Sequence, residues 1–259
     1  MKKLFGVASI ILCTFAPLTS PPQAQTTVAS EAAQEYNEAG RFYQTGDFRE
    51  ALSRYEHLIA RGIEHPDLYF NASNAAYRSG NLGQAILSIE RSLKLNPSDE
   101  DALANRAFLN SLRQDQGPAE DNPVLALIER TYETITLNGA LNVSAVMFAG
   151  AMLLFSSALF WERWKRRVLV TCGVIFCLFF LGSTGIALYK MNRLAIVHDA
   201  IILADEAYSY SGPGTDNVHI FTIHEGTKVT VERRERGWCL IRLQSGAGGW
   251  IQTDALEEI

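Results

Sequence analysis

The fold of this chain is decided by TITLNGALNVSAVMFAGAMLLFSSALFW at residues 134–161 and VLVTCGVIFCLFFLGSTGIALY at residues 168–189. Neither stretch contains Asp, Glu, Lys, Arg or His, and each is long enough for the roughly 20 helical residues that cross a bilayer core. Either stretch alone would also suit a buried helix of a large soluble domain. The two in tandem predict a transmembrane helical hairpin, with spans at 138–161 and 168–189.

The connector between the two stretches, ERWKRR at residues 162–167, carries a net charge of +3. Short loops rich in Lys and Arg stay in the cytoplasm. We expect the cations of the connector to set the topology: these are Arg163, Lys165, Arg166 and Arg167. The regions before and after the hairpin then lie together in the periplasm, on the outer side of a bacterial inner membrane.

The start of the chain favours the same orientation. Lys2 and Lys3 precede an apolar stretch at 4–15, and small residues follow, so residues 1–24 are predicted to be a signal peptide that ends at Ala24. If the segment is not cut, it becomes one more anchor and the next region is still exported. Of the cysteines, only Cys239 falls in exported sequence, so no internal disulfide framework is expected.

Two segments of the N-terminal region, YQTGDFREA at 43–51 and YRSGNLGQA at 77–85, are offset by 34 residues. Each copy offers a glycine for a positive φ at a helix end and then a polar residue that can cap the next helix. These pairs are Gly46 with Asp47 and Gly80 with Asn81. Period and pattern resemble the tetratricopeptide repeat, which implies stacked helical hairpins.

Two such repeats bury too little surface alone, so a further helix over 98–112, starting at Ser98, is expected to cover the open end. The predicted helical domain then covers 32–114. The predicted amphipathic linker at 115–137 either lies on the outer leaflet or continues into the first span.

The N-terminal region carries 15 acidic and 9 basic residues between Glu31 and Asp121, a net charge of −6, which argues against nucleic acid as a partner. The resemblance implies a concave groove that binds a peptide or a folded protein. The predicted contact residues are Arg41, Asn71, Asn74 and Arg78. The same side chains would also suit a solvated helix face.

Beyond Lys190 the hydrophobic period becomes alternating, with glycine-rich turns at 212–214, at Gly237 and at 246–249, so a small all-β barrel is predicted at 195–259. The order of its turns, with HEGTKV at 224–229 and GGWI at 248–251, resembles the bacterial Src-homology-3-like barrel.

That resemblance implies binding of cell-wall peptides or of proteins through exposed aromatic rings. The predicted contacts are Tyr208, Tyr210, Trp238 and Trp250, although a barrel this small also needs large rings to fill its interior, and at least one tryptophan is expected to be structural. His219, His224 and Glu225 lack a third ligand at a sensible spacing, so no metal site is predicted.

The whole chain is thus predicted to be a multidomain membrane protein with α-helical repeats, a transmembrane hairpin and a terminal β barrel. This order of modules resembles the BatE-type proteins of the Bacteroides aerotolerance operon. The resemblance implies a scaffold without enzymatic activity or cofactors, which works beside membrane proteins with von Willebrand factor A domains and a MoxR-type ATPase. A cell-wall tether, whose barrel holds peptidoglycan, is the alternative. Catalysis is not expected, because the sequence shows no nucleophile grouped with a base and an acid. It also shows no glycine-rich loop that would bind nucleotide phosphates.

Overall fold

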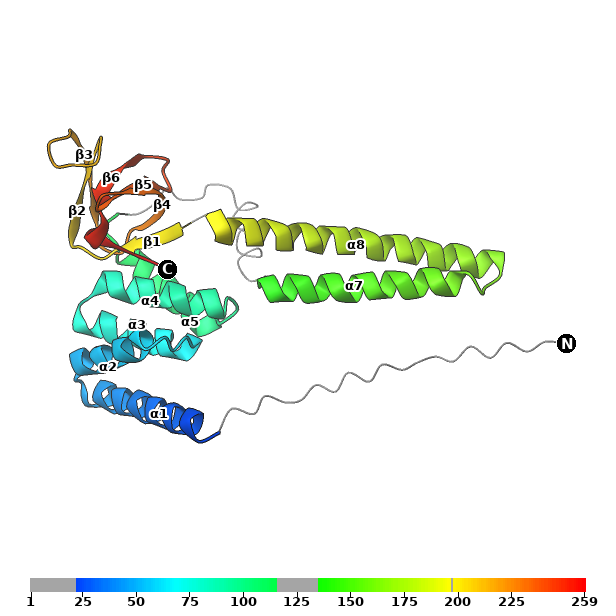
Figure 1. Ribbon diagram of the computed structural model, residues 1–259, viewed down its shortest axis with the longest axis horizontal. Helices are drawn as coiled ribbons and strands as arrows, with labels where there is room; N and C mark the ends of the chain where they lie inside the picture. Colours follow the sequence, from blue (N-terminus) through cyan, green and yellow to red (C-terminus); the bar gives the residue numbers. More distant parts are fainter. Residues whose placement is uncertain (1–21, 116–134, 197) are drawn as a thin grey trace.

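The computed structural model describes residues 22–115, 135–196 and 198–259, which form three parts. The helical domain contains α1 (Pro22–Thr45), α2 (Phe48–Ala60), α3 (Pro66–Ser79), α4 (Leu82–Leu95) and α5 (Glu100–Ser111). The helical hairpin contains α7 (Leu137–Ala158) and α8 (Arg163–Ile196). The β domain follows, and Figure 1 shows it lying against the helical domain while the hairpin extends away from both.

The helical domain is built from two antiparallel helix pairs, α1–α2 and α3–α4. Gly46 and Gly80 end the first helix of each pair at φ +88° and +93°, where a side chain would be strained, so these turns are confirmed. Ala51 and Ala85 are fully buried and let the paired helices approach closely. The 34-residue offset therefore places equivalent residues at equivalent depths in the core.

The cap of α5 differs from the prediction. Asp99, not Ser98, is the N-cap, and its carboxylate accepts a hydrogen bond from the Ala102 N–H at 3.1 Å. The helix therefore begins at Glu100. Ala102 and Leu109 are its buried positions, whereas the C-cap residue Leu112 is 45% exposed.

The β domain is a single antiparallel sheet in the order β3-β2-β6-β5-β4-β1-β7. Its elements are β1 (His198–Ile202), β2 (Glu206–Tyr210), β3 (His219–His224), β4 (Lys228–Glu235), β5 (Trp238–Leu243), β6 (Gly248–Gln252), the 3₁₀ turn η1 (Thr253–Ala255) and β7 (Leu256–Glu258). The two-residue turn between β4 and β5 has positive φ at both Arg236 and Gly237, which suits the right-handed twist of a hairpin. The predicted turns at 212–214 and Gly237 are confirmed, whereas the turn predicted at 246–249 ends earlier, because Gly248 and Gly249 are the first residues of β6.

The helical hairpin is held by two phenylalanines that pack on glycines. A Cβ added at Gly150 would lie 2.6 Å from the ring of Phe176, and one added at Gly173 would lie 2.8 Å from the ring of Phe155. Small residues allow this close approach of helices. Both helices are long and apolar enough to cross a membrane.

The connector of the hairpin is shorter than predicted. α8 begins at Arg163, so the predicted loop at 162–167 is mostly the first turns of that helix. Lys165 places its ammonium 4.6 Å from the ring centroid of Trp161. Arg163, Lys165, Arg166 and Arg167 are all exposed at the end of the hairpin that lies farthest from the other two parts.

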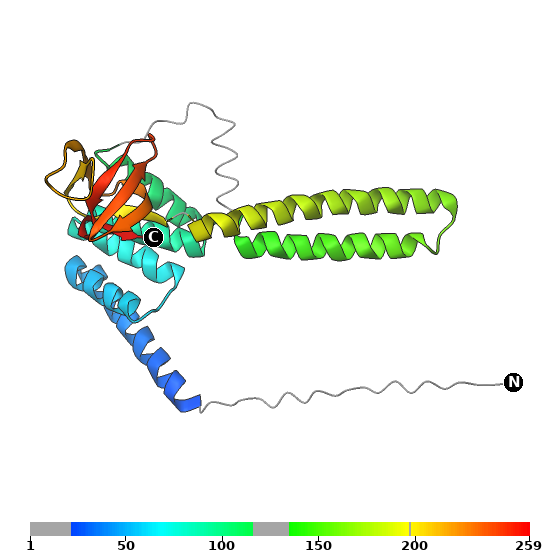
Figure 2. The ribbon, with the colours of Figure 1, turned by 45° about the horizontal axis from the view of Figure 1, so that its top comes forward.

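The ends of the hairpin that join the other parts lie at the same side, beside the helical and β domains, as Figures 1 and 2 show. β1 begins two residues after α8 ends. Most of the predicted signal peptide at 1–24 and of the predicted linker at 115–137 falls outside the described residues.

Candidate functional site

A pocket of about 240 Å³ opens on the helical domain where α1, α3 and α5 meet. It is lined by Tyr43, Ser73, Asn74, Tyr77, Arg78, Asn105, Phe108 and Leu109. None of the lining residues comes from α2 or α4, so the pocket lies on the face formed by the first helix of each pair and by α5.

The lining of the pocket includes a pair of amides. The Asn105 side-chain N–H donates to the Asn74 side-chain carbonyl at 2.9 Å. An amide side chain has two donor hydrogens and one acceptor oxygen, so the pair keeps spare donors on Asn74 and a spare acceptor on Asn105. That combination matches one peptide unit of an extended chain.

The rim of the pocket is aromatic. The rings of Tyr77 and Phe108 meet edge to face with centroids 5.3 Å apart, and the two residues are 39% and 47% exposed. The guanidinium of Arg78 lies 4.2 Å from the ring centroid of Phe48, which holds a positive charge at the edge. The pocket therefore combines apolar area, one cation and amide hydrogen bonding.

The structure brings together some of the predicted contacts. Asn74 and Arg78 line the pocket. Asn71 instead donates to the Tyr36 hydroxyl at 2.6 Å and joins α3 to α1, and Arg41 is exposed on α1 outside the lining.

The contribution of α5 to the pocket was not predicted from the sequence, although Asn105 follows Asn71 by the same 34-residue offset as the two glycine turns.

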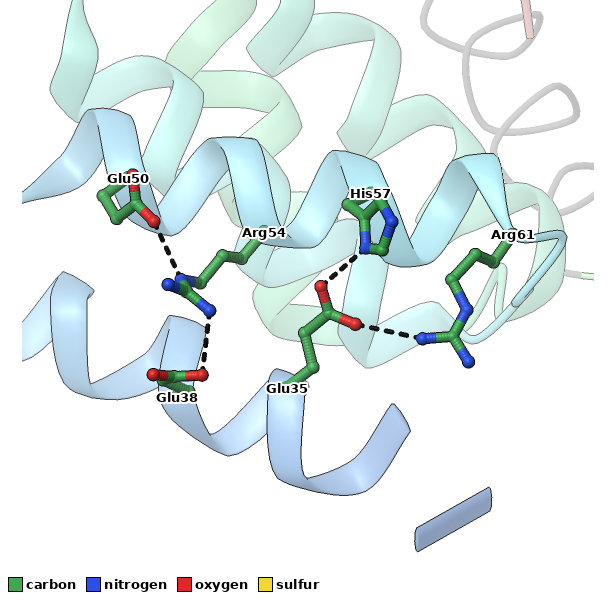
Figure 3. Close-up of polar contacts among 6 residues, drawn as sticks. All are labelled: Glu35, Glu38, Glu50, Arg54, His57 and Arg61. Atoms are coloured by element: carbon green, nitrogen blue, oxygen red, sulfur yellow. Dashed lines mark hydrogen bonds and ion pairs between the residues drawn. The ribbon is translucent and has the colours of Figure 1, made fainter. Parts of the chain in front are cut away.

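A cluster of ion pairs holds α1, which supplies Tyr43, against α2. Figure 3 shows the Glu35 carboxylate between His57 at 2.6 Å and Arg61 at 3.1 Å. Arg54 contacts the carboxylates of Glu38 at 2.8 Å and Glu50 at 2.9 Å in the same view. The cluster joins helices and lies away from the pocket lining, so we assign it a structural role.

A second candidate site is an aromatic cluster on the β domain, formed by Tyr208, Tyr210, His219 and Trp238. His219 lies with its ring centroid 5.6 Å from that of Tyr208 and 6.0 Å from that of Tyr210, and Tyr210 meets Trp238 at 5.7 Å. Tyr208 is 51% exposed, and its hydroxyl donates to Glu206 at 2.9 Å, which together with the charge of that carboxylate raises the pKa of the phenol.

Trp250, which was predicted as a contact residue, is only 5% exposed. It pairs with Tyr210 across β2 and β6, and the Arg233 guanidinium lies 4.9 Å from its ring centroid. The core of the β domain contains its strand neighbour Ile251 and not Trp250, so the Trp250 ring lies on the other face of β6, where Arg233 covers it. Tyr208, Tyr210 and Trp238 are the predicted aromatic residues that remain exposed or partly exposed.

Histidine in the β domain serves contacts within the protein. The His224 ring lies between the Asp115 carboxylate at 3.0 Å and the Gln114 amide at 3.0 Å. Within the part of the chain that the structure describes, no group of three or more His, Cys, Asp or Glu side chains is placed to hold a metal ion.

Comparison with known proteins gives a match for one of the three parts. No curated protein matches the chain significantly. The bacterial SH3 domain family matches at residues 204–258, which cover β2 to β7 and all four residues of the aromatic cluster. Residues 204–258 of this chain are therefore a bacterial SH3 domain.

Proposed function

We propose that this protein is a non-enzymatic scaffold of the bacterial inner membrane, whose helical and SH3 domains both lie in the periplasm and bind envelope proteins. The observation that carries the proposal is the direct contact between these two domains, beside the same end of an apolar hairpin. Two domains in contact share one compartment.

The dimensions and charge of the hairpin support membrane insertion. At about 1.5 Å per residue, the 22 residues of α7 extend roughly 33 Å, close to the thickness of a bilayer core. The exposed cations at the start of α8 lie at the far end of the hairpin, where the positive-inside rule favours the cytoplasm.

The helical domain is the proposed protein-binding module. Its two helix pairs, with left-handed glycines 34 residues apart, support a tetratricopeptide-like interpretation. The pocket suits an extended peptide, because the amide pair matches a peptide unit while the Tyr77 and Phe108 rings offer apolar area to an aromatic or aliphatic side chain. By the resemblance to BatE-type proteins, the proposed partners are membrane proteins with von Willebrand factor A domains and a MoxR-type ATPase system.

A cell-wall tether is the second proposed function, and the exposed aromatic cluster favours it. Bacterial SH3 domains commonly bind peptidoglycan or proteins. Aromatic faces suit the apolar surface of sugars and peptides alike. In this version the SH3 domain holds peptidoglycan while the helical pocket recruits a protein.

Topology is tested by labelling single cysteines in intact cells with a maleimide that does not cross the inner membrane. Cysteines introduced at Ser53 of α2 and Ser245 of the β5–β6 turn should react from the periplasmic side, and one introduced at Glu162 should react only after permeabilisation. Reaction of the first two from opposite sides would refute the proposal.

Binding is tested by retention of envelope proteins on the full chain in detergent. Tyr77→Ala should lose the retained partner, whereas Arg41→Ala, an exposed change outside the pocket, should keep it. If the full chain sediments with purified peptidoglycan and the Tyr208→Ala variant does not, the result would favour the cell-wall tether. Equal retention by the Tyr77 and Arg41 variants would argue against the pocket as the binding site.

A further inference from the structure

One face of α4 is covered by the β domain, which consists of the SH3 domain at 204–258 with β1 before it and Ile259 after it. Gly83, Ile86, Glu90, Arg91 and Lys94 recur at helical spacing and all contact the β domain. They lie on the second helix of a pair, whereas the pocket is lined by first helices and α5. The two surfaces are therefore separate.

The contact has an apolar centre supplied by β1. The Ile201 side chain is fully buried within the core of the helical domain, while its neighbours Ala200 and Ile202 point into the core of the β domain. Leu203 and Ile259 pack against the same helical core. A strand that faces solvent on one side would not place a large aliphatic residue there.

The two backbones approach closely at two glycines. A Cβ at Gly83 would lie 2.8 Å from the Ile202 carbonyl oxygen and 3.2 Å from the Leu203 Cα, and both are backbone atoms that cannot rotate away. A Cβ at Gly226, which has φ +79°, would lie 2.6 Å from the Ile86 side chain. A side chain at Gly83 would therefore meet fixed backbone, and one at Gly226 would force the end of the Ile86 side chain to move.

The SH3 domain also caps α4. Asn81, predicted to cap this helix, makes no side-chain cap hydrogen bond. Instead the Glu225 carboxylate accepts from the Gly83 N–H at 3.1 Å and places a negative charge at the helix N-terminus, where the helix dipole favours it. A group 142 residues away in sequence therefore does what the local residue was expected to do.

The edges of the contact are polar. After α5, the Asp115 carboxylate accepts from the His224 backbone N–H at 2.7 Å and from the Thr227 hydroxyl at 3.1 Å. Nearer the centre, Lys228 donates to Glu90 at 3.1 Å, and the Glu90 side chain is only 12% exposed. At the other edge, Arg91 pairs with Glu257 at 2.8 Å.

We propose that the SH3 domain is the built-in partner of α4, and that the two domains form one rigid recognition unit which presents the helical pocket and the aromatic cluster together. Docking leaves both sites open, because neither the pocket lining nor Tyr208, Tyr210, His219 and Trp238 takes part in the contact. The docking stands on the contacts alone, and the use of both sites by ligands rests on the proposed function.

Docking is tested by the distance between spin labels at Ser53 of α2 and Ser245 of the SH3 domain, measured by pulsed electron resonance on the full chain in nanodiscs. The native cysteines are replaced first. We expect one narrow distance distribution. Gly83→Ala should broaden it, because the added Cβ meets fixed backbone. Gly40→Ala is the matched control, since its Cβ would meet only the Tyr55 hydroxyl at 3.8 Å and the distribution should stay narrow.

A charge exchange supplies an independent variant. Arg91→Glu should broaden the distribution by placing two carboxylates together, and the added change Glu257→Arg should narrow it again. A broad distribution in the unmodified sequence, or equal effects of the Gly83 and Gly40 variants, would overturn the proposal. Because no ligand is present, failure here is distinct from failure of the binding assays.

Discussion

Replacement of Ile201 by alanine should separate the two domains without unfolding either. The side chain is fully buried in the helical core, although the residue belongs to β1. The change removes three carbon atoms from the contact. At about 0.8 kcal/mol for each buried methylene-sized group, docking should lose about 2 to 2.5 kcal/mol. A cavity that cannot collapse would add to this loss.

That loss corresponds to a roughly 30- to 70-fold larger undocked fraction. Hydrogen exchange of the full chain, read by mass spectrometry, measures it locally. Amides protected by docking, in the first turn of α4 and in the β3–β4 turn, should exchange faster by this factor. The slowest amides of β5 should be unaffected, because they are protected by the sheet itself.

Ile202→Ala is the matched control, since this neighbour is equally buried but in the core of the β domain. It should accelerate exchange in β4 and β5 as the sheet loses stability. If Ile201→Ala gives the same pattern as Ile202→Ala, or leaves the α4 amides unchanged, then Ile201 does not hold the domains together and the reasoning is wrong.

Three other changes test separate features. Burial would raise the pKa of Asp115, but the hydrogen bonds donated by His224 and Thr227 outweigh burial and lower this pKa from its ordinary 3.8. The Asp115 carboxylate therefore stabilises the fold above that pH, and this stabilisation is lost as the pH falls further. In urea titrations, the stability difference between the unmodified chain and Asp115→Asn should be largest at neutral pH and vanish in strong acid. Gly173→Leu should cost about 1 to 3 kcal/mol by overpacking the hairpin, and lower the thermal midpoint in detergent, whereas Gly182→Leu, with open space around it, should not. Glu35→Gln breaks partly exposed ion pairs and should cost less than about 1 kcal/mol in thermal denaturation; a larger loss would mean that the α1–α2 cluster is more than a surface network.

The elements that the sequence predicted well are those set by local chemistry. Gly46 and Gly80 need positive φ whatever surrounds them, and the alternation of Val229 and Val231 defines a strand with one buried face. The cap of α5 was misplaced by one residue, because Ser98 and Asp99 are both good caps and only the backbone geometry selects between them.

The features that were missed depend on contacts between distant segments. Asn81 has the right chemistry for a cap, but Glu225 provides the hydrogen bond instead. One signal was present in the sequence: Ala200 to Leu203 is a continuous apolar run, which is typical of a strand buried on both faces. An alternating pattern would have been expected for a strand at the surface of an independent barrel.

The docking contact also bears on how the chain crosses a membrane. The helical domain precedes α7 and the SH3 domain follows α8. If only one of these helices crossed a bilayer, the membrane would separate the domains, and neither the burial of Ile201 nor the hydrogen bond from Gly83 to Glu225 could form. Two crossings return the chain to the side from which it started, so the contact argues against a single crossing and is compatible with a complete hairpin. The charge of the connector favours the same arrangement for an unrelated reason, because it depends on cations at 163–167 that take no part in docking.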